Sequence, residues 1–127
     1  MDLIHLDTNY LIGVIAKHPP VIQNLTQWIQ TGKKISVSAV VWAEFLNGPV
    51  EKSQTDLVLQ MIEGRIHPFT EQTAQISARL FNQAQRKRDL RFDSFIAASA
   101  IEHHAMFATL NSNDFGLFVS AGLKLAT

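Results

Sequence analysis

The sequence contains no cysteine among its 127 residues. Disulfide bonds and thiolate metal sites are therefore excluded, so a bound metal would need ligands other than sulfur. Long hydrophobic runs are also missing, because no apolar stretch approaches the roughly 18 residues that span a bilayer. The first residues lack the basic start and apolar stretch of a signal peptide. We therefore expect a cytoplasmic protein with no membrane contact.

An excess of charge of one sign is missing as well. Eleven basic residues balance eleven acidic ones, unlike the composition of a strongly basic, indiscriminate nucleic-acid binder. A local excess does occur at four positions, with only Asp89 opposing it: Arg86, Lys87, Arg88 and Arg91. We take these four as candidate contacts to RNA phosphates. The alternative is a solvated helix end, where the helix dipole favours cations.

Hydrophobic residues make up 46% of the chain, enough for a folded core. The length suits one domain, and we predict a single domain over residues 1–127. Strands are expected at 3–6, 35–37, 65–69, 106–109 and 123–125. Helices are expected at 9–16, 20–30, 39–46, 57–64, 70–84 and 92–103, with a short helix or turn at 115–120.

Alternation of strands and helices with short connections is typical of a parallel sheet with crossover helices. We predict an α/β fold: a three-layer α/β/α sandwich with four or five strands in the order 3-2-1-4-5. Ligands of such sheets bind outside the carboxyl ends of the strands, where the strand order changes direction. That point lies between the first and fourth strands, so the segments that follow them should border a crevice.

Four acidic residues occupy positions that this fold would bring to one edge of the sheet. They are Asp7 after the first strand, Glu44 in the 39–46 helix after the second strand, Asp93 at the start of the 92–103 helix, and Asp114 after the fourth strand. Two unit charges 4 Å apart repel by about 4 kcal/mol at an effective dielectric of 20. A shared pocket therefore needs protons or a cation, and oxygen ligands favour Mg²⁺ or Mn²⁺.

Each acid also has a simpler interpretation. Asp7 or Asp114 could cap a helix, and Asp93 could be a first-turn acid that the helix dipole favours. Glu44 could be a surface residue, although its neighbours are mostly apolar. These separate roles do not explain why acids recur at the same edge of the predicted sheet.

The stretches "LDTNYLI", "SAVVWAEFLNG", "DSFIAASA" and "TLNSNDF" together resemble the PIN-domain ribonucleases, most closely the VapC-like toxins of toxin–antitoxin pairs. The resemblance covers essentially the whole chain, in the family's order and separations. It implies a Mg²⁺- or Mn²⁺-dependent endoribonuclease, and it matches the family's acidic quartet to Asp7, Glu44, Asp93 and Asp114. The polar supporting positions are matched by Thr8, Ser38, Thr109 and Asn111. A homodimer, an RNA substrate and a small cognate antitoxin are also implied.

Two features depart from the family pattern. The stretch "QRKRDLRF" lacks the glycine or proline expected before Asp93, and Asp89 lies one helical turn earlier and could compete for the ligand role. A catalytically silent PIN-like interaction module and another Mg²⁺-dependent phosphoesterase remain alternatives. A phosphatase of the phosphoaspartyl type would need an aspartate at Asn9, and a silent module should not take up Mn²⁺.

The histidines do not suggest chelation. His103 and His104 are adjacent on a helix, so their side chains diverge by about 100°. His18 and His67 flank prolines and are expected in loops. His5 lies in the first strand, where we predict a core or edge position.

Overall fold

The structure is a computed structural model, and it describes residues 2–126. A parallel five-stranded sheet with the order β3-β2-β1-β4-β5 forms its centre, which confirms the predicted order. The strands are β1 (Leu3–Leu6), β2 (Lys34–Ser38), β3 (Ile66–His67), β4 (Met106–Ala108) and β5 (Lys124–Leu125). Ile4 pairs with both Ile35 and Met106. This register brings the carboxyl ends of β1 and β4 level with each other.

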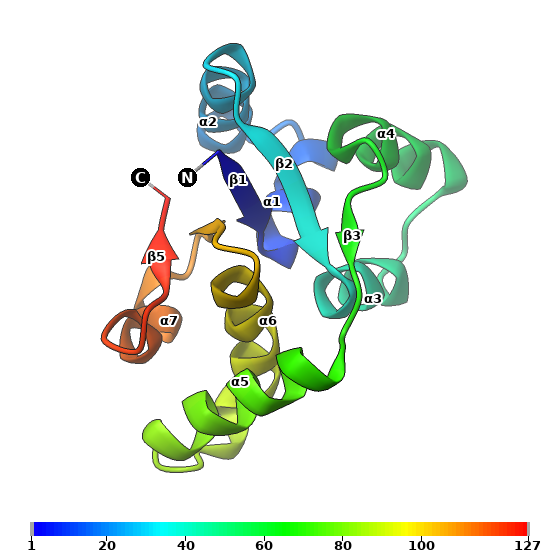
Figure 1. Ribbon diagram of the computed structural model, residues 1–127. Coiled ribbons are helices and arrows are strands. Elements are labelled where there is room, and N and C mark those ends of the chain that lie inside the picture. The colour runs from blue at the N-terminus through cyan, green and yellow to red at the C-terminus, as the bar shows by residue number, and fades with distance from the viewer. Residues whose placement is uncertain (1, 127) are drawn as a thin grey trace.

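Helices cover both faces of the sheet and complete the three predicted layers (Figure 1). Right-handed crossovers explain the division, because the chain moves outward from β1 to β3 along one face and returns to β4 along the other. The first face carries α1 (Thr8–Ile15), α2 (Pro19–Gln30), α3 (Ala39–Asn47) and α4 (Lys52–Ile62). The return path to β4 contains α5 (Glu71–Gln83), a 3₁₀ turn η1 (Arg88–Leu90) and α6 (Arg91–Glu102). Helix α7 (Ser112–Val119) then connects β4 with β5.

Local capping chemistry determines where several helices begin. Asp7 accepts a hydrogen bond from the Thr8 amide at 2.8 Å, and Ser38 accepts one from the Val41 amide at 3.1 Å. These bonds satisfy amides that the first turn of a helix leaves without partners. The caps place α1 and α3 directly after the carboxyl ends of β1 and β2. The arrows of β1 and β2 in Figure 1 point to the end of the molecule that holds α3, α5 and α6.

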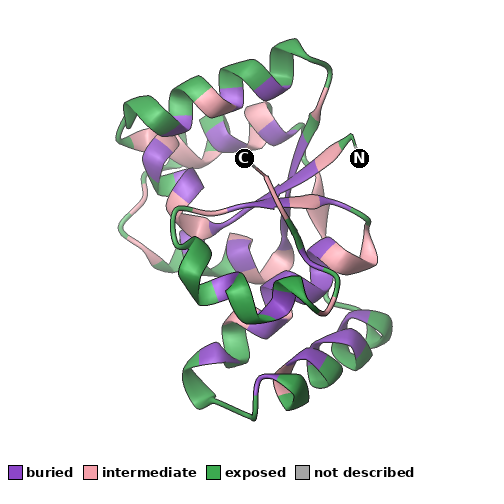
Figure 2. Ribbon diagram, turned by 90° about the vertical axis from the view of Figure 1, so that its left-hand side faces the viewer, coloured by how far each residue is buried: buried purple, intermediate pink, exposed green. Residues whose placement is uncertain are grey.

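Small residues on α6 let this helix lie close to the sheet. Ala97, Ala98 and Ala100 have no exposed surface. On the same side, the ring centroids of Phe107 on β4 and Phe115 on α7 are 4.6 Å apart. Figure 2 shows buried residues along the strands and on the sides of the helices that face them. This packing holds the first turns of α6 and α7 at the carboxyl edge of the sheet.

Three expectations about local structure were wrong. Helix α7 begins at Ser112 rather than near residue 115, so Asp114 lies in its first turn and not in a loop. His67 belongs to β3, where it pairs with Ser38. This strand is shorter than predicted because Pro68 has no amide hydrogen to extend the ladder. The loop position expected for His18 is confirmed, since it lies just before α2 as its N-cap residue, without a capping bond from its side chain.

Within residues 2–126, no helix combines the length and the apolar character needed to span a membrane.

Candidate active site

The four predicted acids line one open depression at the carboxyl edge of the sheet. The depression has a volume of about 300 Å³. It is lined by Asp7, Thr8, Asn9, Ile12, Glu44, Asp93, Asn111, Asp114 and Phe115. Asp7 comes from the end of β1, Glu44 from α3, and the other two acids from the first turns of α6 and α7. The sheet topology therefore brings together carboxylates that are far apart in the sequence.

Hydrogen bonds hold the side chain of Asp7 in one orientation. Its Oδ1 accepts from the Thr8 amide at 2.8 Å, and its Oδ2 accepts from the Thr109 hydroxyl at 2.7 Å. The residue is 8% exposed. Its backbone amide also donates to the carbonyl of Ala108 at 2.9 Å. Both carboxylate oxygens are thus positioned by the segments that directly follow β1 and β4, before any ligand arrives.

Asn9 links helix α1 to the loop between β4 and α7. Its Nδ2 lies 3.3 Å from Asp7 Oδ2 and 3.4 Å from Thr109 Oγ1, while its Oδ1 accepts from the Leu110 amide at 3.2 Å. The sequence indicates this residue only through its position two residues after Asp7. Its bonds to the 109–110 segment become visible only in the folded chain.

Of the four predicted supporting residues, Thr8, Thr109 and Asn111 lie at the site, whereas Ser38 lies away from it. Thr8 donates from its hydroxyl to Glu44 Oε1 at 2.7 Å, which holds the exposed Glu44 toward the depression. Asn111 lines the depression, and its amide donates to Thr109 Oγ1 at 3.0 Å. Ser38 instead caps α3, the helix that carries Glu44. Its effect on the site is therefore indirect, through the placement of α3.

The clustered carboxylates make the depression strongly electronegative. Burial raises the pKa of Asp7, and the charges of Glu44 and Asp114 raise it further, against the opposing effect of its hydrogen bonds. Burial also raises the pKa of Asp93 to about 6, with further contributions from Asp7, Asp114, Glu44 and Asp89. A cation in the depression would lower the pKa of both groups, because an opposite charge favours the ionised form.

The chemistry of these side chains fits a hard divalent cation. Four carboxylates, with hydroxyl and amide oxygens beside them, are the ligand types that Mg²⁺ and Mn²⁺ prefer. Within residues 2–126, however, no three acidic or histidine side chains already stand in an arrangement that would hold an ion. Ion binding would therefore require some of these side chains to rotate, and the exposed Glu44 and Asp114 have room to do so.

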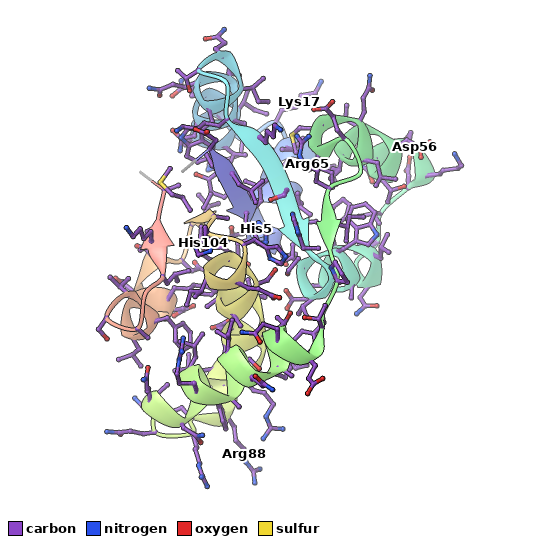
Figure 3. All side chains as sticks on the ribbon, viewed as in Figure 1. His5, Lys17, Asp56, Arg65, Arg88 and His104 are labelled. Carbon is purple, nitrogen blue, oxygen red and sulfur yellow. The ribbon has the colours of Figure 1, made fainter. Side chains whose placement is uncertain are left out.

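The predicted phosphate contacts lie apart from the acids. Arg86, Lys87 and Arg88 are exposed between α5 and α6, and Figure 3 shows Arg88 at the end of this helix pair that is far from the sheet. Arg91 is also exposed, and its guanidinium lies 5.5 Å from the centre of the Phe81 ring. In the part of the chain that the structure describes, neither these four residues nor Asp89 line the depression, whereas Asp93 does.

An apolar hollow borders the acidic depression and was not predicted. Its volume is about 360 Å³, and Glu44 lines both hollows. Three aromatic side chains form much of its wall: Phe69, Phe92 and Phe95. Phe92 is 60% exposed. The sequence offers no signal for this surface, because a helix with apolar residues normally buries them.

Fold and site together define an α/β protein with a carboxylate-rich depression where the strand order of a parallel sheet changes direction. A model of the PIN domain matches residues 4–116. The chain therefore belongs to the PIN-domain family, which confirms the resemblance predicted from its motifs. Among curated proteins, none matches this chain.

Solved structures are similar over nearly the whole chain. VapBC2 from Rickettsia felis, bound to a DNA fragment from its promoter, is 25% identical with a TM-score of 0.79, covering 98% of this chain and 97% of that one. FitAcB from Neisseria gonorrhoeae is 25% identical with a TM-score of 0.69, covering 98% and 96%. A toxin–antitoxin complex from Klebsiella pneumoniae shares the fold, at 24% identity, a TM-score of 0.71 and coverage of 91% and 90%.

Proposed function

We propose that this protein is a metal-dependent endoribonuclease that hydrolyses RNA phosphodiester bonds and acts as the toxin of a toxin–antitoxin pair. The observation that carries the proposal is the meeting of Asp7, Glu44, Asp93 and Asp114 in one depression. Membership of the PIN-domain family supports a nuclease, and the similar VapBC2 and FitAcB structures support the toxin role.

Asp7, Asp93 and Asp114 would hold one or two Mg²⁺ or Mn²⁺ ions, with Glu44 as a further ligand or as the base that orients water. Such an ion, when bound, neutralises phosphate charge and makes water more acidic. Thr8 and Thr109 keep both oxygens of Asp7 in place, so Asp7 itself needs little reorganisation on binding. Thr8 also keeps Glu44 beside Asp7.

The exposed cations between α5 and α6 would contact RNA phosphates outside the depression. They lie on the segment that leads into the helix of Asp93, so an RNA strand could reach both surfaces. Reversal of the charges at Arg86 and Arg88 should weaken RNA affinity and reduce its dependence on salt. Unchanged affinity and salt dependence would leave these residues as a solvated helix end.

The direct test is RNA cleavage by the purified protein in Mg²⁺ or Mn²⁺, with and without EDTA. We expect cleavage to stop in EDTA and to fall by about 100-fold or more in Asp7→Asn, since the loss of a group that only supports a metal ligand already costs about 10–100-fold. Asp56→Asn is the matched control, because Asp56 lies on the outer side of α4 and pairs with Lys52 at 2.8 Å (Figure 3). Full activity in Asp7→Asn would refute the assignment.

The partner can be tested in cells. Production of this protein alone should arrest growth, and co-production of a small antitoxin encoded beside it should restore growth. We also propose a homodimer, which light scattering after gel filtration would detect. Failure to bind Mn²⁺ in calorimetry would favour a silent interaction module instead.

A further inference from the structure

Three histidines from distant segments pack together on the side of the sheet that α6 covers. They are His5 on β1, His67 on β3 and His103 at the end of α6. The ring centroids of His67 and His103 are 4.1 Å apart, and that of His5 lies 4.9 Å from the former and 5.7 Å from the latter. Figure 3 labels His5 in this region between β1 and α6.

Two of the three rings have hydrogen-bond partners, and those of His5 require its neutral form. The hydroxyl of Ser36 donates to the Ile4 carbonyl at 3.0 Å, so it accepts from His5 Nδ1 at 2.7 Å. His5 Nε2 then accepts from the Ser99 hydroxyl at 3.0 Å. His103 Nδ1 donates to the Ser99 carbonyl at 2.8 Å. These bonds define the tautomers of both rings.

His67 differs from them because its Nε2 is buried without a hydrogen-bond partner, the only such side-chain nitrogen or oxygen found in residues 2–126. Burial lowers the pKa of His67, and the neighbouring His103 lowers it further. The Glu102 charge opposes this effect, while Arg65 adds to it. A proton on this ring would introduce a positive charge that has no acceptor in place.

The carboxylate that could accept from a protonated His67 is already engaged. Glu102 accepts from the Thr73 hydroxyl at 2.5 Å and from the Thr70 hydroxyl at 3.3 Å. The same two threonines cap α5, since Thr70 Oγ1 accepts from the Thr73 amide at 3.2 Å and the Thr70 amide donates to Thr73 Oγ1 at 3.0 Å. Any bond from His67 to Glu102 must therefore compete with the start of α5.

We propose that His67 and His103 form a proton-operated latch that holds the edge strand β3 and the first turn of α5 against the end of α6. In the neutral state the two rings pack against each other, and Glu102 remains bonded to the threonines. Protonation of His67 separates the rings and draws Glu102 away, so β3 leaves β2 and the first turn of α5 loosens. Only residues 68–70 connect β3 with α5, so the two movements are coupled.

The other charged groups near His67 either belong to the latch or have other partners. Three titratable groups face His67 from other elements. His5 belongs to β1, and Glu102 and His103 lie at the end of α6. The segment before β3 contributes Arg65, whose guanidinium bonds Glu63 at 3.1 Å and whose Nε donates to the Ile35 carbonyl at 2.9 Å. The only charged residue of α3 is Glu44, which lines the acidic depression.

The latch would affect the surface beside the acids. Phe69 lies in the connection between β3 and α5, and its ring centroid is 5.2 Å from that of Phe95. Both rings line the apolar hollow that borders Glu44. Release of β3 would therefore reshape this hollow at acidic pH. The proposal does not depend on nuclease activity.

Amide hydrogen exchange of the full chain between pH 7 and 5 tests the latch. The Val37 amide bonds the Arg65 carbonyl at 3.1 Å and reports on β3, while the Ala74 amide bonds the Thr70 carbonyl at 2.9 Å and reports on α5. After correction for intrinsic exchange, we expect opening at both amides to increase by up to about tenfold per pH unit, the limit for uptake of one proton. The Asp7 amide, bonded to Ala108 in the centre of the sheet, reports on global unfolding and should open far less often than either of them throughout this range.

Variants identify the group that takes up the proton. His67→Gln should abolish the pH dependence at Val37, whereas His18→Gln, at an exposed position that starts α2, should leave it intact. His103→Gln serves as a second variant if His67→Gln does not fold, and ring nitrogen shifts of the unmodified protein report the protonation of His67 directly. Opening at Val37 that does not change with pH would overturn the proposal. Retention of the full pH dependence at Val37 in both His67→Gln and His103→Gln would overturn it as well.

Discussion

Replacement of Asp93 by asparagine should stabilise the protein in the absence of divalent ions. The carboxyl group of Asp93 is half-buried, and burial together with the charges of Asp7, Asp114, Glu44 and Asp89 raises its pKa from 3.8 to about 6. Each pKa unit corresponds to about 1.4 kcal/mol, so ionisation at pH 8 would cost at most about 3 kcal/mol. Solvent screening of this partly exposed group reduces the expected gain in Asp93→Asn to roughly 1–2 kcal/mol.

The gain should depend on pH in a defined direction. Because the folded-state pKa of Asp93 is raised, the folded protein retains a proton between pH 3.8 and about 6 that the unfolded chain has released. The free energy of unfolding of the unmodified protein therefore falls as pH rises through this window. Asparagine cannot titrate, so the advantage of Asp93→Asn should be absent below the window and complete above it.

Urea denaturation in EDTA at pH 4 and pH 8 measures this difference, and Asp89→Asn is a useful control. Asp89 is exposed and contributes less to the Asp93 pKa than any of the other three acids. We expect Asp89→Asn to change the free energy of unfolding by only a few tenths of a kcal/mol, as is usual for substitutions at exposed sites. If Asp93→Asn is less stable than the unmodified protein at pH 8 in EDTA, the reasoning about carboxylate repulsion is wrong.

Three further predictions concern the supports of the fold. Thr109→Val should lower the free energy of unfolding by about 1–2 kcal/mol in urea denaturation, because Asp7 Oδ2 loses the donor now 2.7 Å away. Thr109→Ser keeps the hydroxyl donor and should retain most of this free energy of unfolding. Gly13→Ala should lose about 1–3 kcal/mol by overpacking, since a Cβ there would lie 2.7 Å from Val21 Cγ2. In calorimetry, the stability lost in Gly13→Ala and that lost in Val21→Ala should not add up in the double variant, because the two residues are in contact. His5, buried with a pKa lowered to about 3, stays neutral while the unfolded chain gains a proton. Stability should therefore fall by roughly 2–3 kcal/mol between pH 6.5 and 4.5, and His5→Gln should remove this contribution in acid denaturation.

Features that depend on neighbouring residues could be predicted without the structure. The caps at Asp7, Ser38 and Thr70 follow from short-range bonds between a side chain and the next turn. The strand order followed from alternating elements, because right-handed crossovers leave few topologies for them. Placement of Asp7, Asp93 and Asp114 at one edge required only this topology. Glu44 also lines the depression, but its orientation depends on the bond from Thr8, which the topology does not force.

Features that depend on contacts between distant segments were beyond local patterns. Asn9 bonds the Leu110 amide across 101 positions, and His5 meets Ser99 across 94. His67 falls within the strand predicted at 65–69, but its packing against His5 and His103 depends on contacts that no local pattern shows. Short-range propensities determined which segments form strands and helices in this chain. Folding decided which polar atoms find partners, because those partners come from elements that only the packed sheet brings within hydrogen-bonding distance.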